Sequence, residues 1–277
     1  MFARHNAPNR AVEGHFLPSS RGGARYTQPT QNLVDAFPMI NGKPISDPAS
    51  GYDPNNPYVN RDPRFANTII YNESMLWWGN FSSMRPVYTF DNVAPHFPTS
   101  AQDQFGANGT TTGYYGRKMA EVNTSSNTER GWPLIRYAEI LLNYAEAINE
   151  TGQPELAVPK LIEIRNRAGI EPGDNGRYGI PVGVTVAQLR EIIHNERRIE
   201  LAFEGGHRYF DLRRWKMMQE GARQNEVMRI TRNADGTYTY NRDLSIRVHN
   251  FRPALYLYPI PQSEINKMPL MVQNPGY

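Results

Sequence analysis

Residues 195–215 read NERRIELAFEGGHRYFDLRRW, and this stretch decides how the second half of the chain is expected to fold. It begins inside a helix that opens at Thr185, where a glutamine three residues later gives the spacing of a capping box. Gly205 and Gly206 are expected to end that helix, because glycine tolerates the positive φ found at helix C-termini. A second helix is predicted over about 207–219. The stretch therefore predicts a helix–turn–helix pair.

The charges in this stretch are ordered. Glu196, Glu200 and Glu204 lie four residues apart on one helix face, and a column of carboxylates repels itself unless cations lie between its members. The cations expected to pair with these glutamates and with Asp211 are the neighbouring Arg197, Arg198, Arg208, Arg213 and Arg214. The pattern favours a partly buried ion network that fixes how the two helices meet. The alternative is a catalytic carboxylate pair.

Motifs for metal-assisted or nucleophilic catalysis are missing from the sequence. His194 does not begin an H-E-x-x-H motif, and the six histidines are scattered without ligand spacing. The absence of cysteine excludes disulfides and thiol catalysis. We therefore predict no catalytic residue, no metal ligand and no cofactor. A glycoside hydrolase stays open as an alternative, because its two carboxyl groups need not be close in the chain.

The composition fits one loop-rich domain. A chain of 277 residues can bury a sizeable core, and its 22 glycines and 22 prolines indicate many loops. The net charge of +3 is spread along the chain, so no nucleic-acid-binding patch is predicted. No apolar run is long enough to span a bilayer.

Helical hairpins dominate the predicted fold. One hairpin joins a helix that starts near Pro133 to a helix over 154–167, and the pair described above forms another. Their short links make each hairpin similar to a tetratricopeptide unit. A small β-hairpin is predicted from 227–232 and 237–240. The predicted fold class is mainly α, with these hairpins carrying a large loop-rich face.

The first part of the chain predicts little regular structure. Residues 1–30 are polar and are expected to form an extended loop. Residues 65–72 alternate and are rich enough in β-branched side chains to predict a short strand.

Aromatic side chains in a polar loop are the strongest binding signal. Trp77 and Trp78 can pack on the C–H face of a sugar ring, while Asn72, Asn80 and Arg85 can hydrogen-bond its hydroxyls. Neighbours in an extended segment face opposite ways, so one tryptophan is expected to be the platform and the other to pack inward. The alternative is that both tryptophans only pack the loop onto the helices.

Three other aromatic residues are expected to serve packing. Tyr52 and Tyr58 lie among prolines and are expected to pin that loop, with ligand contact as the alternative. Trp132 precedes the helix predicted near Pro133, where a tryptophan is more often a packing residue than a ligand platform.

Residues 195–215 resemble the N-E-R-R-x-E-L-x-F-E-G-x-R-x-x-D-L-R-R-W signature of SusD/RagB family proteins, the surface lipoproteins of Bacteroidetes nutrient-uptake systems. Other segments resemble family motifs in the expected order: PTQNLVDAF at 29–37, NRDPRF at 60–65, RYAEILLNYAEA at 136–147 and LYPIP at 257–261. The resemblance covers nearly the whole chain, but only the second half of a typical family member.

The resemblance implies a SusD-like domain, with 1–130 as its loop-rich, ligand-facing part and 131–277 as its helical C-terminal part. It implies a binding protein without catalysis, which captures oligosaccharides as a lid on a SusC-like TonB-dependent transporter in the outer membrane. Some relatives serve peptide uptake. Residues 1–6 lack the apolar core of an export signal, so the signal, the lipid-attachment cysteine and the first helices are expected upstream of Met1.

Two further interpretations remain open. A tetratricopeptide-like scaffold could bind a protein or peptide and no glycan, and a hydrolase could act on a glycan. Titration with oligosaccharides separates the first from the leading interpretation, and a turnover assay separates the second. The sequence does not identify the glycan, since specificity depends on the shape of the loops.

Overall fold

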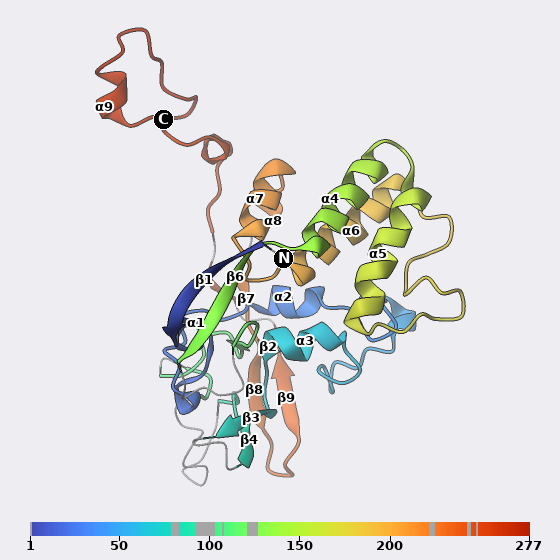
Figure 1. The fold of residues 1–277 in the computed structure, drawn as a ribbon. Helices are drawn as coiled ribbons and strands as arrows, with labels where there is room; N and C mark the ends of the chain where they lie inside the picture. The colour runs from blue at the N-terminus through green and yellow to red at the C-terminus, as the bar shows by residue number, and fades with distance from the viewer. Residues whose placement is uncertain are drawn as a thin grey trace.

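The computed structural model describes residues 2–78, 83–91, 103–106, 108–120, 127–221, 225–242, 245–247 and 249–277. Within these ranges the chain is mainly helical, as predicted, with small two-stranded antiparallel sheets (Figure 1). The main helices are α1 (Ala11–Phe16), α2 (Gln31–Ala36), α3 (Pro63–Thr68), α4 (Tyr137–Glu150), α5 (Pro154–Ala168), α6 (Val186–Glu200), α7 (His207–Arg214), α8 (Met218–Gly221) and α9 (Gln262–Ile265). The strands are β1 (Phe2–Asn9), β2 (Ile69–Ile70), β3 (Ser74–Trp78), β4 (Ser83–Val87), β5 (Tyr115–Gly116), β6 (Thr128–Ile135), β7 (Asn225–Glu226), β8 (Arg229–Arg232), β9 (Tyr238–Asn241) and β10 (Ser245–Arg247). None of the described helices is long and apolar enough to cross a membrane.

Helices α4, α5 and α6 pack together around one apolar core (Figure 1). The predicted α4–α5 hairpin is confirmed, and α5 ends where Gly169 adopts a φ of 85°. Side chains from all three helices are fully shielded from solvent, among them Leu142, Ala145, Leu161, Leu189 and Ile193. Burying a side chain of leucine or isoleucine size stabilises a fold by roughly 1.5–3 kcal/mol, so this core holds the helical layer together.

The second helical pair begins as predicted. Thr185 Oγ1 accepts the N–H of Gln188 at 3.3 Å, and the Gln188 side chain accepts the N–H of Thr185 at 3.0 Å. This confirms the capping box of α6. Gly205 and Gly206 have φ values of 52° and 75° and lie in the turn before α7. Helix α7 ends at Arg214, earlier than the predicted 219.

The prediction that the first long helix starts near Pro133 is wrong. Residues before Tyr137 belong to β6, which pairs with β1 so that Trp132 lies opposite Arg4 and Pro133 opposite Ala3 (Figure 1). Proline has no N–H to donate, but it is tolerated in an edge strand, and a register shift lies beside Ala3. Pairing with β1, more than a hundred residues away in the chain, thus makes this segment a strand.

The first part of the chain holds more regular structure than predicted. Residues 1–30 are not an extended loop, since they contain β1 and α1. The first half of the strand predicted over 65–72 belongs to helix α3, and only Ile69–Ile70 forms β2. The Asp62 carboxylate accepts the N–H of Arg64 at 2.8 Å, and Pro63 occupies the first helical position. These start signals override the alternating pattern.

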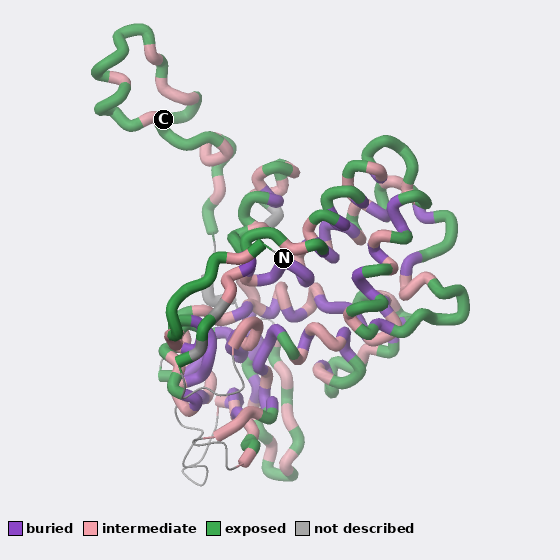
Figure 2. The backbone as a smooth tube through the Cα atoms, in the orientation of Figure 1, coloured by how far each residue is buried: buried purple, intermediate pink, exposed green. Residues whose placement is uncertain are grey.

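An aromatic core joins the first part of the chain to the last strands. Its buried members come from α2, α3, the segments around them and β8, and include Val34, Phe37, Phe65, Phe90, Tyr114 and Ile230. The predicted β-hairpin is confirmed as β8 and β9, with Arg232 opposite Tyr238. Residues 249–277 extend away from the body of the molecule as a largely exposed arm that carries α9 (Figures 1 and 2).

Candidate ligand-binding site

The two tryptophans that are predicted to form a platform lie in a β-hairpin. β3 pairs with β4 in antiparallel register, with Trp77 opposite Met84 and Trp78 opposite Ser83. Successive side chains of a strand point to opposite faces of a sheet, so the two indoles lie on different faces. This hairpin lies at the opposite end of the molecule from α4 and α5 (Figure 1).

Trp78 lies on the inner face of the hairpin. Leu76, on the same face, packs against a fully buried apolar cluster that includes Tyr115. The guanidinium groups of Arg21 and Arg85 lie 4.7 and 5.5 Å from the centre of the Trp78 ring system. The Arg21 side chain also donates to the Arg85 carbonyl at 2.8 Å. Two cations therefore lie within about 6 Å of the Trp78 ring, and such contacts stabilise the hairpin.

Trp77 lies on the outer face. Its neighbours on that face, Met75 and Met84, are 47% and 44% exposed. Trp77 itself is half-buried. Large apolar side chains gathered on an open face of a hairpin provide a flat surface on which a ring can stack. The geometry therefore separates the two tryptophans into an outward and an inward residue.

The polar residues predicted beside the tryptophans have different surroundings. Arg85 is exposed on β4. Asn72 is 4% exposed, and its side-chain oxygen accepts the N–H of Thr89 at 2.9 Å. Asn80 lies outside the described residues. The structure thus brings Arg85 to Trp78, on the face of the hairpin away from Trp77, whereas Asn72 supports the backbone at Thr89.

The two loop tyrosines differ in burial. The Tyr58 ring packs against Phe65, Tyr71 and Tyr240, and its hydroxyl lies 3.3 Å from that of Tyr114. Burial raises the pKa of Tyr58 well above its usual value. The packing role expected for Tyr58 is confirmed. Tyr52 is half-buried, with the Arg61 guanidinium 5.6 Å from its ring.

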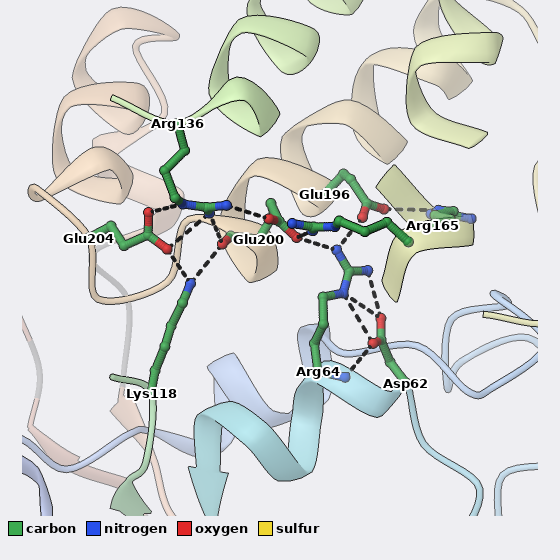
Figure 3. A network of polar contacts seen from close by, with 9 residues as sticks. Asp62, Arg64, Lys118, Arg136, Arg165, Glu196, Glu200 and Glu204 are labelled. Carbon is green, nitrogen blue, oxygen red and sulfur yellow. Dashed lines mark hydrogen bonds and ion pairs between the residues drawn. The ribbon is translucent and has the colours of Figure 1, made fainter. Parts of the chain in front are cut away.

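The three glutamates, which we call the ladder, lie in a buried ion network, as the sequence predicts (Figure 3). Glu196 and Glu200 belong to α6, but Glu204 lies in the turn that follows, because α6 ends at Glu200 and not at the predicted Gly205 and Gly206. Arg64 of α3 donates to Glu196 at 2.7 Å and to Glu200 at 2.9 Å. Its other donors reach Asp62, the closest contact being 2.7 Å. One arginine from the first part of the chain therefore links α3 to two turns of α6.

Four other cations complete the network. Lys118 and Arg136 pair with Glu204 at 2.5 and 2.6 Å, and Figure 3 shows both reaching across from other elements. The remaining two contacts are Arg165 with Glu196 at 2.9 Å and Arg167 with Glu200 at 2.7 Å. Burial alone would raise the pKa of Glu200, but the charges of Arg64 and Arg167 outweigh it and lower that pKa to about 2.

The prediction of which cations pair with the three glutamates of the ladder is wrong. The described contacts pair the three glutamates with none of the five arginines of 195–215. Arg197 instead holds Asp211 at 2.9 and 3.0 Å, and Arg214 contacts Asp211 at 3.0 Å. Arg213 donates to the Leu255 carbonyl at 2.6 Å. The pairing with Asp211 is therefore confirmed, while the ladder is neutralised from outside the helical pair.

Two adjoining cavities lie between β1, β6 and the ion network. The first has a volume of 690 Å³, and its wall includes His15, Phe16, Trp132 and Phe203. The second has a volume of 550 Å³ and is lined by the charged network. Met119 lines both, so the cavities meet at this residue. Both volumes suit a small ligand.

Sequence reasoning missed these cavities because their residues belong to separate motifs. Arg64 stands in the 60–65 segment and Arg136 in the 136–147 segment, each of which was interpreted alone. Trp132 was predicted to pack, yet it lines the first cavity. In the described part of the chain, no cluster of three or more His, Cys, Asp or Glu side chains is placed to hold a metal ion.

The fold places the chain among proteins built from tetratricopeptide-like helical hairpins. Residues 2–277 match the model of the SusD family, and the chain belongs to this family. Similar proteins include SusD-like protein P2 of Formosa agariphila, 34% identical over 167 residues that make up 59% of this chain and 29% of that protein.

Solved structures give the same result. A SusD-like protein of Bacteroides fragilis is 27% identical with a TM-score of 0.74, over 100% of this chain and 54% of its own. A SusD-like carbohydrate-binding protein of the same species is 28% identical with a TM-score of 0.68, over 95% of this chain and 52% of its own. This chain thus spans about half the length of these structures.

Proposed function

We propose that this chain is the glycan-binding component of an outer-membrane nutrient-uptake complex, which captures oligosaccharides at the cell surface for a SusC-like TonB-dependent transporter. Membership of the SusD family supports this role, as does the similarity to a carbohydrate-binding protein of Bacteroides fragilis. The observation that carries the proposal is the outer face of the β3–β4 hairpin, where Trp77 lies between two exposed methionines.

The proposed contact follows from the chemistry of sugars. A pyranose presents C–H groups on one face, which pack on an aromatic ring, and hydroxyls around its edge. Trp77 supplies the ring on the open face of the hairpin. Arg85 lies opposite Leu76, so its exposed N–H donors are on the Trp78 face and would meet the part of the ligand that passes the edge of the hairpin. Asn80 remains part of the proposed site by its position in the sequence, while Trp78 and Asn72 support the hairpin.

Binding without catalysis is part of the proposal. The glutamates that could have formed a catalytic pair are held by buried arginines and a lysine, and the pKa of Glu200 is lowered to about 2. A general acid needs the opposite shift, since it must hold its proton near neutral pH. A second candidate function, a scaffold that binds a protein or peptide, is favoured by the helical hairpins alone.

Calorimetric titration with a panel of neutral and charged oligosaccharides tests the proposal, with peptides of similar size as the comparison. We expect saturable binding of at least one oligosaccharide, no release of reducing ends during long incubation, and loss of affinity in Trp77→Ala. Binding of peptides alone would favour the scaffold, and turnover of a glycan would overturn the non-catalytic role.

A further inference from the structure

The two cavities beside the ion network are neighbours that share Met119 and Gly131 in their walls, and we call the two together the groove. At one end, Trp132 is half-buried in the wall, and Phe16 packs edge-on against Phe203 with ring centres 5.3 Å apart. At the other end the lining is charged. The ends meet at Met119 and Gly131, which line both cavities. A ligand long enough to cross this junction would contact both an aromatic surface and an ionic surface.

The backbone of the groove is strained at two places. Met119 has a φ of 65° and Phe203 a φ of 63°, although neither is glycine. Non-glycine residues in the left-handed region cost free energy and are concentrated at functional sites, where the surroundings hold them in place. Both strained residues line the groove, and neither lies in the β3–β4 hairpin. This groove is therefore a second, separate candidate site.

The charged end carries an excess of positive charge. Four cations, Arg64, Lys118, Arg136 and Arg167, line it together with only two carboxylates, Glu200 and Glu204. The wider network adds Arg165, Asp62 and Glu196, so that five cations face four carboxylates. Since the pKa of Glu200 is lowered to about 2, this carboxylate stays ionised, and the network is still one positive charge in excess near neutral pH.

Arg167 has N–H donors available to a ligand. Its side chain is 53% exposed, whereas those of Lys118 and Arg136 are 20% and 18% exposed. Its contact in the described part of the chain is a single carboxylate oxygen of Glu200 at 2.7 Å. A guanidinium has five N–H donors in a planar fork that fits the two oxygens of a carboxylate or sulfate. Arg167 can therefore bind an anion without giving up its partner in the network.

We propose that this groove is a binding subsite for an anionic oligosaccharide, with one sugar ring stacked on Trp132 and the carboxylate or sulfate of another sugar of the same ligand bound by Arg167. The saccharide class rests on the proposed function, whereas the position of the groove does not depend on Trp77. Positive charge inside a cleft attracts such a ligand, because the surrounding protein focuses the field. A uronic acid and a sulfated sugar share the oxyanion that Arg167 recognises.

Calorimetry on the intact protein with matched pairs of oligosaccharides tests this inference. One pair is hexagalacturonate and the neutral α-1,4-linked galactohexaose, and the other is a sulfated carrageenan hexasaccharide and its desulfated form. We expect one charged member to bind about tenfold more tightly than its neutral partner, with a preference that falls as salt is added. The pair that shows the preference identifies carboxylate or sulfate as the anion.

Variants locate the effect. Arg167→Gln should abolish most of the preference for the charged member and leave the neutral member unaffected. Arg190→Gln is the matched control, because Arg190 is also a helical arginine that pairs with one glutamate, Glu150, at 2.5 Å, but lies outside the groove. Trp132→Ala should weaken both members about tenfold at this subsite. If Trp132→Ala does not fold, the two arginine variants still decide the outcome.

The results that would overturn the inference are distinct. Equal affinities within both pairs, with neutral binding that is lost in Trp77→Ala, would reject the groove and leave the proposed function standing. The same rejection follows if Arg167→Gln behaves like Arg190→Gln. If no oligosaccharide binds at all, the proposed function and this inference fall together.

Discussion

The helical part and the hairpin end of this molecule are organised by different forces. Helices α4, α5 and α6 share a core of aliphatic side chains, and the ladder is locked by buried ion pairs to α3. The β3–β4 hairpin has one face packed on a small apolar cluster and another face open to solvent. Substitutions are therefore expected to be tolerated better on the open face of the hairpin than in the helical part. The helical part is held in one geometry by its core and its ion pairs, whereas one face of the hairpin is open to solvent.

The largest effect should come from Arg64→Ala. This change leaves Asp62, Glu196 and Glu200 without their shared cation in a buried setting, and such a loss costs about 3–5 kcal/mol of unfolding free energy. Urea denaturation measures it. Arg190→Ala removes an exposed ion pair instead and should leave the unfolding free energy nearly unchanged. Equal costs for the two variants would show that burial of the ion network adds nothing to the stability of the helical part.

The second largest effect should come from acid, which weakens the ion pairs between α6 and α3. The pKa of Glu200 is lowered from 4.5 to about 2 in the folded protein, because the charges of Arg64 and Arg167 outweigh the effect of burial. The folded state therefore binds this proton less readily than the unfolded state. The resulting stability, ~3 kcal/mol, is fully present above about pH 4.5 and is lost as the pH falls toward 2.

Glu200→Gln provides the control for the acid effect. A glutamine cannot titrate, so the dependence of stability on pH between about 4.5 and 2 should be flatter than in the parent. Unfolding free energies from urea curves at several pH values supply the measurement. A slope that is unchanged in this variant would show that other carboxylates cause the acid sensitivity.

The open hairpin face should show its effect in binding. Trp77→Ala is expected to weaken oligosaccharide binding about tenfold or more, since an indole stacked on a sugar contributes on the order of 1–3 kcal/mol. Trp78→Ala removes a ring that contacts Arg21 and Arg85, so it should lower stability and leave the affinity of the folded protein unchanged. Calorimetry and thermal melting separate the two outcomes. The opposite pattern would exchange the roles of the two tryptophans.

The sequence predicts those features that depend on nearby residues. The start of α6 at Thr185, the extent of α5 and the β8–β9 hairpin all depend on caps, glycines and periodic apolar residues within a few positions. The opposite facing of Trp77 and Trp78 depends only on the alternation of a strand. The family signature adds the arrangement of the hairpins, which periodicity alone does not give.

Other features depend on partners far away in the chain, and these were missed. β6 is a strand because β1 lies beside it, and the ladder is neutralised by Arg64, Lys118 and Arg136. Among the arginines next to the ladder in sequence, Arg197 and Arg214 pair with Asp211, and Arg213 donates to the Leu255 carbonyl. The groove at Met119 is assembled from six separate segments, so no single stretch of sequence carries its signal.

The smallest effect is expected for a helix cap, and it compares a contact between near neighbours in the chain with one between distant segments. Thr185 and Asp62 both cap helices, but Thr185 is exposed and bonds only within its own capping box. Asp62 is 1% exposed and holds Arg64 as well as the helix start. Thr185→Ala should cost about 1 kcal/mol, the usual contribution of an N-cap, whereas Asp62→Ala should cost several times more because Arg64 loses a buried partner. Urea denaturation of both variants measures the two losses of unfolding free energy. Equal losses would mean that the ion pair with Arg64 adds nothing to the cap. Local signals, which are the easiest to predict, would then be as important for stability as the distant contacts.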